Sequence, residues 1–372
     1  MTSVSEPTAL DQLWYTRCPV PTASGLAYNL GWLDEAFAPA GLSVGVLQDA
    51  PPEIARHHFD HQLLGLFREG GNVPALVARS EGAPTRLIGL TWIDEWQSIL
   101  TRPDTGIASA ADLAGRRIAL PGWAGSRGTS FPRAMALHGF AQALALAGLT
   151  LADVEVVEVE SRVERAPGND PSAAAPWPGL AQLAEGVVDA VYVKGARSAE
   201  QAREIGAVVA LDLDATPDLW SRVNNGTPRP ITVHEELLAE RPELVVRFLV
   251  ETLRASRWAA THVDELRAIL GREVGSGAAG VLDAYGDDVH LSLTPTLDEE
   301  RLALLGQQER FLHEHGFLAS RVDVAAWAAH EPLAEALRDL DTSSASAPDY
   351  SISQPGASAP DYSISQGEEV AR

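Results

Sequence analysis

Strand-like and helix-like segments alternate along most of this 372-residue chain. That order is typical of sheets with mostly parallel strands, because parallel neighbours are joined by crossovers that usually contain a helix. The segments before residue 100 and those from there to about residue 211 predict two such sheets, and the rest of the chain is mainly helical. We therefore expect an α/β fold whose two mostly parallel sheets are flanked by helices, which fits a chain long enough for about two domains.

Apolar periodicity and glycine or proline breakers place the expected elements. Strands are expected at residues 12–16, 42–47, 85–92, 154–159, 188–193, 206–211 and 230–233, with one more ending at 120. Helices are expected at residues 25–37, 62–68, 130–147, 180–186, 242–262, 265–271, 298–315 and 322–340.

Residues 341–372 differ in composition from the rest of the chain. The segment Ala345–Gln354 is repeated residue for residue at Ala357–Gln366, and both copies are rich in serine and proline. Such a segment has too little apolar surface to offset the entropy of ordering. We expect a disordered tail.

Charge and cysteine content exclude several classes of partner. The formal net charge is −23 and the pI is about 4.7, which argues against nucleic acids and anionic membranes. One cysteine cannot form an internal disulfide or a cysteine-rich metal site. No apolar run is long enough for a signal peptide or a membrane span, so we expect a cytoplasmic protein.

The single cysteine, Cys18, lies in the segment Trp14–Thr22, which also contains two prolines. A residue before proline avoids helical dihedrals, and proline cannot donate to a sheet ladder. Cys18 is therefore expected in extended backbone at the end of the strand at 12–16. Two interpretations stay open, a small buried apolar residue and a reactive thiol.

The surroundings of Cys18 favour the reactive thiol. Thr22 or Ser24 can cap the helix expected at 25–37, and the positive N-terminal end of that helix would face the sulfur. Arg17 adds a neighbouring cation, and both features favour a thiolate.

Three segments resemble the type II periplasmic-binding-protein family, and they occur in the family's usual order: residues 31–42, 111–118 and 186–191. The resemblance implies a bilobal fold in which the chain crosses twice between the lobes. Lobe one would comprise residues 1–100 and 216–340, lobe two residues 101–215, and the tail residues 341–372. Such binders normally carry an export signal, and its expected absence here indicates another use for the cleft.

A closer resemblance is to the aryl sulfinate desulfinases of dibenzothiophene desulfurisation. It is carried by Cys18-Pro19-Val20-Pro21, His58-Phe59 and Arg68-Glu69-Gly70-Gly71-Asn72-Val73-Pro74, and it continues through residues 112–118 and 302–329. It implies that the chain releases sulfite from an aromatic sulfinate, such as 2'-hydroxybiphenyl-2-sulfinate, without a cofactor. Thr16 replaces the family's serine, and residues 123–138 differ widely, so the aryl group is not defined.

The resemblance also implies the roles of the site residues. Cys18 would be the nucleophile or the proton donor, His58 the catalytic acid or base, and Arg68 the guanidinium that binds the sulfinate. Gly70 and Gly71 would form a left-handed turn whose N–H groups face an oxyanion, Gly71 being the family's backbone donor. The alternatives are an exposed arginine at a helix end and a glycine C-cap.

The histidine cluster around His58 has two further interpretations. His57 and His61, with Asp60, could bind zinc, but the sequence implies no fourth ligand, so no metal is expected. The cluster could also be a loop without a chemical role.

An aromatic ligand needs an apolar cleft. Phe59, Trp123 and Phe131 are the candidate ligand contacts, and core packing is the alternative for each. The glycine-rich loop at 122–129 lacks the lysine and spacing of a phosphate-binding loop, so no nucleotide is expected.

The favoured function is therefore an aryl sulfinate desulfinase that acts on a small aromatic sulfinate, as a monomer and without a cofactor. The alternative is a cytoplasmic solute-binding protein for a sulfonate-like or aromatic anion. A pyrimidine-synthase-like member of the same fold would need a cysteine-rich motif and iron, and the single cysteine argues against it.

Overall fold

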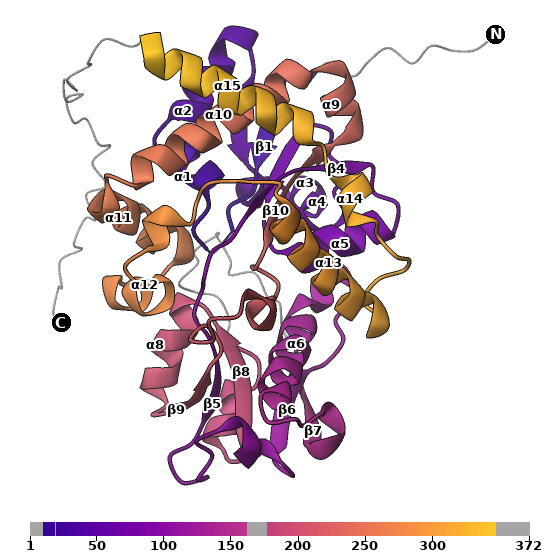
Figure 1. The fold of residues 1–372 in the computed structure, drawn as a ribbon, viewed down its shortest axis with the longest axis vertical. Helices are drawn as coiled ribbons and strands as arrows, with labels where there is room; N and C mark the ends of the chain where they lie inside the picture. Colours follow the sequence, from indigo (N-terminus) through magenta and orange to yellow (C-terminus); the bar gives the residue numbers. More distant parts are fainter. Residues whose placement is uncertain (1–9, 19, 162–176, 347–372) are drawn as a thin grey trace, which may run out of the picture.

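The computed structural model describes residues 10–18, 20–161 and 177–346. In these residues the chain forms two α/β lobes, which lie one above the other in Figure 1. The repeated decapeptides predicted to be disordered lie almost wholly outside the described residues.

Ten strands and fifteen α-helices are described. The strands are β1 (Gln12–Tyr15), β2 (Ser43–Val46), β3 (Leu66–Glu69), β4 (Thr85–Thr91), β5 (Gln97–Thr101), β6 (Arg117–Pro121), β7 (Glu155–Val159), β8 (Ala190–Lys194), β9 (Val208–Asp212) and β10 (Arg229–His234). The helices are α1 (Ala23–Asn29), α2 (Trp32–Phe37), α3 (Pro52–Ala55), α4 (His57–Asp60), α5 (Asn72–Ser80), α6 (Phe131–Ala145), α7 (Leu180–Ala184), α8 (Ala196–Glu204), α9 (Glu235–Glu240), α10 (Pro242–Ala259), α11 (Val263–Val274), α12 (Ala278–Tyr285), α13 (Glu299–Glu314), α14 (Val324–Trp327) and α15 (His330–Ser346).

The two sheets share one topology. Their strand orders are β2-β1-β3-β10-β4 in the upper lobe and β7-β6-β8-β5-β9 in the lower lobe. In the upper sheet β1 runs parallel to β2 and β3, and β10 runs antiparallel to β3 and β4. In the lower sheet β6 runs parallel to β7 and β8, and β5 runs antiparallel to β8 and β9. Each sheet is therefore mostly parallel, as predicted, with one reversed strand in the same place.

The reversed strands are the ones next to the two crossings between the lobes. The chain leaves the upper lobe between β4 and β5, at residues 92–96, and returns between β9 and β10, at residues 213–228. The predicted boundary at residue 100 cuts through β5, which lies wholly in the lower sheet. β5 was not predicted because all five of its residues are buried, so its sequence does not alternate.

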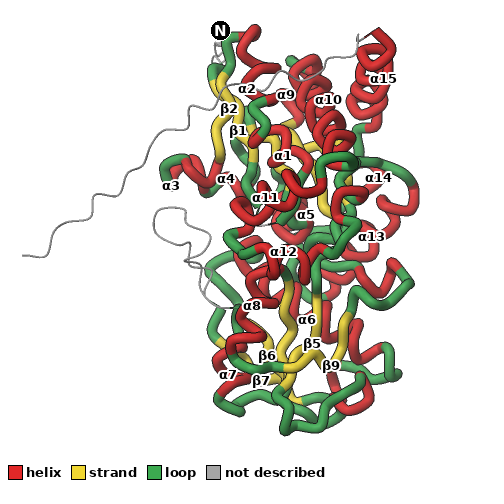
Figure 2. The backbone as a smooth tube through the Cα atoms, turned by 90° about the vertical axis from the view of Figure 1, so that its left-hand side faces the viewer, coloured by secondary structure: helices red, strands yellow, loops and turns green. Residues whose placement is uncertain are grey.

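Helices cover the upper sheet and bury its apolar face. The long helix α10 packs against α1 and α15 (Figure 2), and the ring of Phe248 on α10 stacks on Phe67 of β3 at 4.1 Å. Residues from both ends of the chain therefore share one core, which holds β1 and β3 in place.

Three expected helices differ in the structure. The helix predicted at 62–68 is wrong, because β3 occupies Leu66–Glu69 and is buried on both faces, which hides the strand period. The helix predicted at 25–37 is divided into α1 and α2 at Gly31, whose φ of 79° is left-handed. The helix predicted at 322–340 is divided into α14 (Val324–Trp327) and α15 (His330–Ser346), and α15 continues past residue 340.

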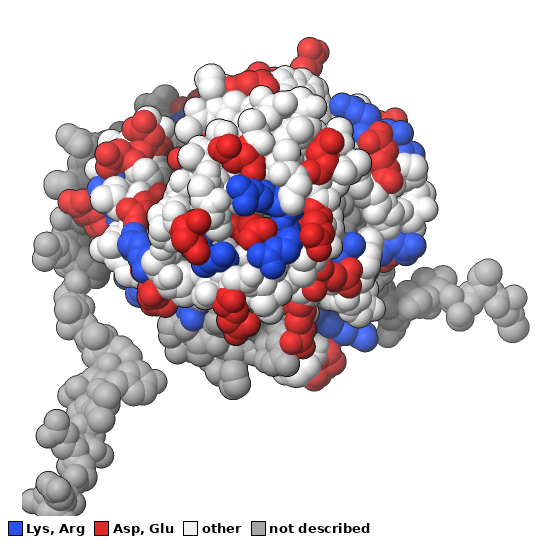
Figure 3. Space-filling view, turned by 90° about the horizontal axis from the view of Figure 1, so that it is seen from below, with Lys and Arg blue, Asp and Glu red and all other residues white. Residues whose placement is uncertain are grey.

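Within the described ranges, no helix is long and apolar enough to cross a membrane. Figure 3 shows the lower end of the molecule, where basic side chains have acidic neighbours and form no large basic patch. On this face the surface matches the acidic composition of the chain.

Candidate active site

Cys18 lies three residues after β1 and is only 6% exposed. The loop that carries it, Thr16–Ser24, is tied at both ends to Glu69 of β3. Thr16 Oγ1 donates to the Glu69 carbonyl oxygen at 3.0 Å, and the N–H and Oγ of Ser24 donate to Glu69 Oε2 at 3.1 and 2.6 Å. Because Glu69 is fully buried, the cysteine loop is fixed to the strand that also carries Arg68.

The helix after this loop begins as predicted, since Thr22 caps α1 by accepting from Gly25 N–H. The guanidinium of Arg17, the cation expected beside Cys18, donates twice to Asp49 at 3.1 Å. Its Nε also lies 3.7 Å from Glu273. A thiolate at Cys18 would act instead on Arg68, because its negative charge would raise the pKa of that buried guanidinium.

Arg68 is buried on β3, with 1% of its surface exposed. Its Nε donates to the His58 carbonyl oxygen and its Nη1 to the Gly71 carbonyl oxygen, both at 3.1 Å. Its Nη2 has no hydrogen-bond partner in the described part of the chain. Burial lowers the pKa of Arg68 to about 10, so the guanidinium is still charged at neutral pH. Arg68 is thus neither exposed nor at the end of a helix.

The turn after Arg68 is not left-handed, which corrects the predicted turn and its alternative, a C-cap. Gly71 has φ −52° and ψ 142° and precedes α5, and Gly70 also lacks a positive φ. The glycines permit close approach instead. A Cβ on Gly70 would lie 2.9 Å from the Arg68 guanidinium carbon, and one on Gly71 would lie 2.5 Å from the Asn225 amide.

Asn225 satisfies the first two N–H groups of α5. Its carbonyl oxygen accepts from Asn72 N–H at 2.6 Å, and its Oδ1 accepts from Val73 N–H at 2.9 Å. No described residue accepts from Gly71 N–H. Arg68 Nη2 and Gly71 N–H are therefore two donors in one turn that a small anion could use.

His58 lies on α4 and is connected to the cysteine loop through Gln48. Gln48 Oε1 accepts from Arg17 N–H at 2.7 Å, which orients the amide so that its Nε2 faces His58 Nδ1 at 3.5 Å. His58 Nδ1 is then an acceptor, and neutral His58 carries its proton on Nε2. The sequence motif thus places His58 one side chain away from the backbone of Arg17, next to Cys18.

The neighbouring histidines do not form a metal site. His57 Nδ1 pairs with Asp60 Oδ1 at 2.6 Å, whereas His61 is buried and neither of its ring nitrogens has a described partner. Burial, and then the charge of Arg68, hold the pKa of His61 well below its usual value. Among the residues that the structure describes, no three His, Cys, Asp or Glu side chains could hold a metal ion. The zinc interpretation is not supported.

The predicted aromatic contacts lie in three different places. Phe59 faces lobe two, since a Cβ on Gly128 would lie 3.9 Å from it. Trp123 is 48% exposed, and its ring lies 4.6 Å from that of Phe317 in a tilted arrangement. Phe131 packs against the cores of both lobes. Of the three, Phe59 adjoins the proposed site through its neighbour His58.

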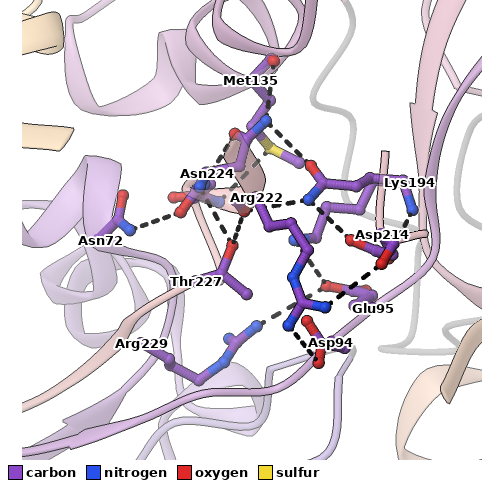
Figure 4. A network of polar contacts seen from close by, with 12 residues as sticks. Asn72, Asp94, Glu95, Met135, Lys194, Asp214, Arg222, Asn224, Thr227 and Arg229 are labelled. Atoms are coloured by element: carbon purple, nitrogen blue, oxygen red, sulfur yellow. Dashed lines mark hydrogen bonds and ion pairs between the residues drawn. The ribbon is translucent and has the colours of Figure 1, made fainter. Parts of the chain in front are cut away.

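The sequence did not single out a second buried polar network, which lies at the crossings between the lobes (Figure 4). The members with ionisable side chains are Asp94, Glu95, Lys194, Asp214, Arg222 and Arg229. One sequence signal was available, because Lys194 is the only lysine in the chain.

Comparisons with known proteins agree with this architecture. The family described as NMT1/THI5 like matches residues 26–266. The chain is 31% identical over 360 residues to the 2'-hydroxybiphenyl-2-sulfinate desulfinase of Rhodococcus erythropolis, covering 88% of this chain and 94% of that protein. The desulfinase of Rhodococcus qingshengii gives the same values.

Solved structures show the same relationship. The crystal structure of the desulfurization enzyme DSZB matches with a TM-score of 0.72 and 29% identity, over 88% of this chain and 99% of that one. A DSZB cysteine-to-serine mutant in complex with biphenyl-2-sulfinic acid matches with a TM-score of 0.73 and 28% identity, over 89% and 99% of the two chains.

A more distant structure extends the likeness of fold. The periplasmic aliphatic sulphonate binding protein SsuA of Escherichia coli matches with a TM-score of 0.62 at 15% identity, over 95% of this chain and 97% of that one. The predicted periplasmic-binding-protein-like fold is therefore confirmed. The chain belongs to the NMT1/THI5-like family and, within it, to the family of 2'-hydroxybiphenyl-2-sulfinate desulfinases.

Proposed function

We propose that this protein cleaves the carbon–sulfur bond of an aromatic sulfinate and releases sulfite. The observation that carries the proposal is the buried guanidinium of Arg68, whose Nη2 lacks a partner in the described chain and whose pKa depends on the charge of Cys18. A buried unsatisfied donor on a charged group is unfavourable unless a ligand completes it. The desulfinase relative and the sulfinate complex of DSZB support the substrate class.

The sulfinate headgroup would be held by two donors from one turn. Arg68 Nη2 donates to one sulfinate oxygen and Gly71 N–H to the other, while Nε and Nη1 stay bonded to backbone carbonyls. The low dielectric of a buried site strengthens these charge-assisted hydrogen bonds. The aryl group then extends from the turn toward the cleft between the lobes.

Cys18 would act as the proton donor. Its S–H gives a proton to the ring carbon that bears sulfur, the carbon–sulfur bond breaks, and its electron pair becomes the new C–H bond. Sulfur leaves as SO2, and Cys18 becomes a thiolate. Water adds to SO2 to give bisulfite and one proton, and His58 relays that proton back to the Cys18 thiolate. The reaction therefore consumes one water and no cofactor, as a hydrolase does.

Electrostatics favour this role over nucleophilic attack. A thiolate that approaches the sulfinate sulfur meets an anion, and one guanidinium must offset both charges. A neutral thiol meets no such repulsion. Thiolate attack would instead leave a covalent sulfur adduct on Cys18.

The test is Cys18→Ser with an aryl sulfinate substrate. We expect the variant to bind the sulfinate with an affinity near that of the wild type and to lose at least about 10³-fold in sulfite release. Full sulfite release by Cys18→Ser would contradict the mechanism. Mass spectrometry of the acid-quenched wild type distinguishes the two roles, because only the nucleophile gives an adduct on the single cysteine.

The same measurements separate this function from passive binding. A solute-binding protein would bind the sulfinate stoichiometrically in calorimetry and release no sulfite. We further propose that the enzyme is cytoplasmic and monomeric, two properties that fractionation and light scattering can test.

A further inference from the structure

The two lobes place cations at equivalent points of equivalent sheets. β3 and β8 are each the third strand of their sheet, and each is followed by glycine and a nine-residue helix, α5 or α8. Arg68 is the third of the four residues of β3, and Lys194 is the last residue of β8. If lobe one uses its cation to bind an anion, lobe two offers a second cation from the same end of the corresponding strand.

Lys194 lacks the hydrogen bonds that a buried ammonium needs. Its side chain is 3% exposed, and its Nζ lies 3.5 Å from Glu95 Oε2 but makes no hydrogen bond within the described chain. An ammonium has three donors and no acceptor. Every other strongly basic residue of the chain is arginine, so the protein has its one lysine at a buried point between the lobes.

A second cation reaches the same point from the other crossing. Arg229, the first residue of β10, has its Nη2 3.8 Å from Glu95 Oε2, and its Nε has no described partner. A Cβ on Gly226 would lie 2.8 Å from Arg229 Nη2 and 3.0 Å from Lys194 Nζ. The two cations therefore lie on either side of one glycine. Figure 4 shows the side chains of Lys194 and Arg229 in the network around Glu95.

Strand register brings this pair next to the proposed sulfinate clamp. Ile231 of β10 pairs with Glu69, and Gly70 N–H donates to the Pro230 carbonyl oxygen at 3.2 Å. Arg229 therefore comes opposite Gly71. Tyr285 lies beside the same groups. Burial, and then the charge of Glu95, raise the pKa of its hydroxyl, and the charges of Arg229 and Cys18 act on it more weakly.

Three acids face the pair and offset its charge only in part. Glu95 is the carboxylate in ionic contact with both cations. Glu69 also interacts with Arg229, but burial raises the pKa of Glu69 and so favours its neutral form. Asp214 also acts on Lys194, but burial raises its pKa to about 7, so it is only partly ionised at neutral pH. Arg222 and Asp94 pair with each other at 3.0 Å and add no net charge.

We propose that Lys194 and Arg229 form a second anion-binding subsite, so that the preferred substrate is an aryl sulfinate with a carboxylate as its second anionic group. The inference rests on the proposed desulfinase function and adds its substrate class. The sulfinate binds to Arg68 in lobe one, and the carboxylate binds to the cations at the crossings.

Binding of unreactive analogues tests the subsite without any chemistry. The probes are benzenesulfonate and the 2-, 3- and 4-sulfobenzoates, titrated into the full-length protein by calorimetry. We expect one sulfobenzoate isomer to bind at least about tenfold more tightly than benzenesulfonate, which is the usual effect of one buried charge pair. Equal affinities would overturn the proposal and assign the unsatisfied donors to buried water.

Substitutions at Lys194 and Tyr285 link that preference to the structure. Lys194→Met should reduce the preference to about twofold or less. Arg117→Gln removes a positive charge at the far end of lobe two, beside Asp189, and should keep the preference. Because Lys194→Met leaves Glu95 with one fewer partner, Tyr285→Phe is the second variant. It deletes a buried hydroxyl beside Glu95, the carboxylate that both cations contact, and should weaken the preference by a smaller factor. An unchanged preference in both variants would overturn the assignment.

Sulfite release from benzenesulfinate and the sulfinobenzoates tests the proposed subsite separately from the proposed desulfinase function. If sulfobenzoate is preferred but no sulfinate yields sulfite, the subsite stands and the desulfinase function fails. If all sulfinates react with equal kcat/KM, the function stands and the subsite fails.

Discussion

The two lobes are built alike but differ in how each holds the cation at the end of its third strand. In lobe one, Arg68 donates to two backbone carbonyl oxygens and keeps one Nη free of described partners. In lobe two, Lys194 has ionic neighbours and no hydrogen bond in the described chain. A guanidinium held in one orientation suits the headgroup that reacts, whereas the ammonium of a lysine suits recognition of a second anionic group on the substrate. The comparison indicates that chemistry belongs to lobe one and selectivity to the crossings.

The second strand in the order of each sheet leads to a different kind of loop. β1 leads into the cysteine loop, which Glu69 ties down at both ends. Its counterpart β6 leads into the loop at 122–130, whose Trp123 packs against Phe317 of the other lobe. Lobe one thus holds a thiol at this point, and lobe two holds a contact between the lobes.

The largest expected effect comes from removing the lobe-one cation. Arg68→Met should lower kcat/KM for benzenesulfinate by about 10³-fold, because the sulfinate loses its charged donor in a buried site. Initial rates of sulfite release measure this. The matched control is Arg79→Met, which removes a partly exposed arginine paired with Glu235 and should change kcat/KM little. If Arg68→Met kept a kcat/KM as high as that of Arg79→Met, the chemistry would not belong to lobe one as we infer.

A smaller effect is expected from loosening the cysteine loop. Glu69→Ala removes the acceptor of Ser24 N–H and Oγ and of Thr91 Oγ1, so kcat should fall by about 10²-fold with little change in KM. The same change should reduce the free energy of unfolding by roughly 2–4 kcal/mol, because buried donors lose their partner.

Glu69→Gln keeps an amide oxygen for Ser24 and is the matched control. It should retain most of kcat and of the stability measured by urea unfolding. A full kcat in Glu69→Ala, at a temperature where the variant is folded, would show that the loop does not need this tie.

A still smaller effect is expected at Gln48. Gln48→Leu removes the acceptor of Arg17 N–H and the amide that faces His58 Nδ1, so the tautomer of His58 is no longer fixed. We expect kcat to fall about tenfold and the pH profile of kcat to change on its acidic side. A lower kcat with an unaltered pH profile would assign Gln48 to loop packing alone.

Local sequence signals predicted the loop that carries Cys18, whereas the position of Arg68 depends on the pairing of β3 with distant strands. The prolines after Cys18 and the cap at Thr22 are local, and the loop lies where they place it. β3 could not be distinguished from a helix because a strand buried on both faces does not alternate. For the same reason Arg68 was expected on a helix end.

The contacts among the charged residues at the crossings could not be predicted from local sequence. Glu95, Lys194 and Arg229 are far apart in the sequence and meet only because both reversed strands adjoin the crossings. The close packing at Gly70 and Gly71 likewise depends on the side chains of Arg68 and Asn225. The sequence therefore indicated that glycine is needed here, but it predicted a left-handed turn rather than close packing as the reason.

The subtlest prediction concerns Asp214, which titrates beside Lys194. Its carboxylate accepts from the N–H and the side-chain amide of Gln97, and burial raises its pKa to about 7. The folded protein therefore keeps this proton at pH values where the unfolded chain has lost it. The free energy of unfolding should decline as the pH rises from about 4 to about 7, by roughly 2–4 kcal/mol, and then level off.

Asp214→Asn isolates that contribution, because the amide is neutral throughout. Urea unfolding at pH 5 and pH 8 should show a smaller decline in the variant than in the wild type, and parallel declines would contradict the raised pKa. Ionised Asp214 also competes for Lys194, so the preference for a carboxylated ligand should weaken above pH 7 in the wild type. Plain benzenesulfonate uses the Arg68 and Gly71 donors and not the subsite at Lys194, so its binding should not follow that change. The pH dependence of the two ligands is therefore a direct measure of how far the lobes differ.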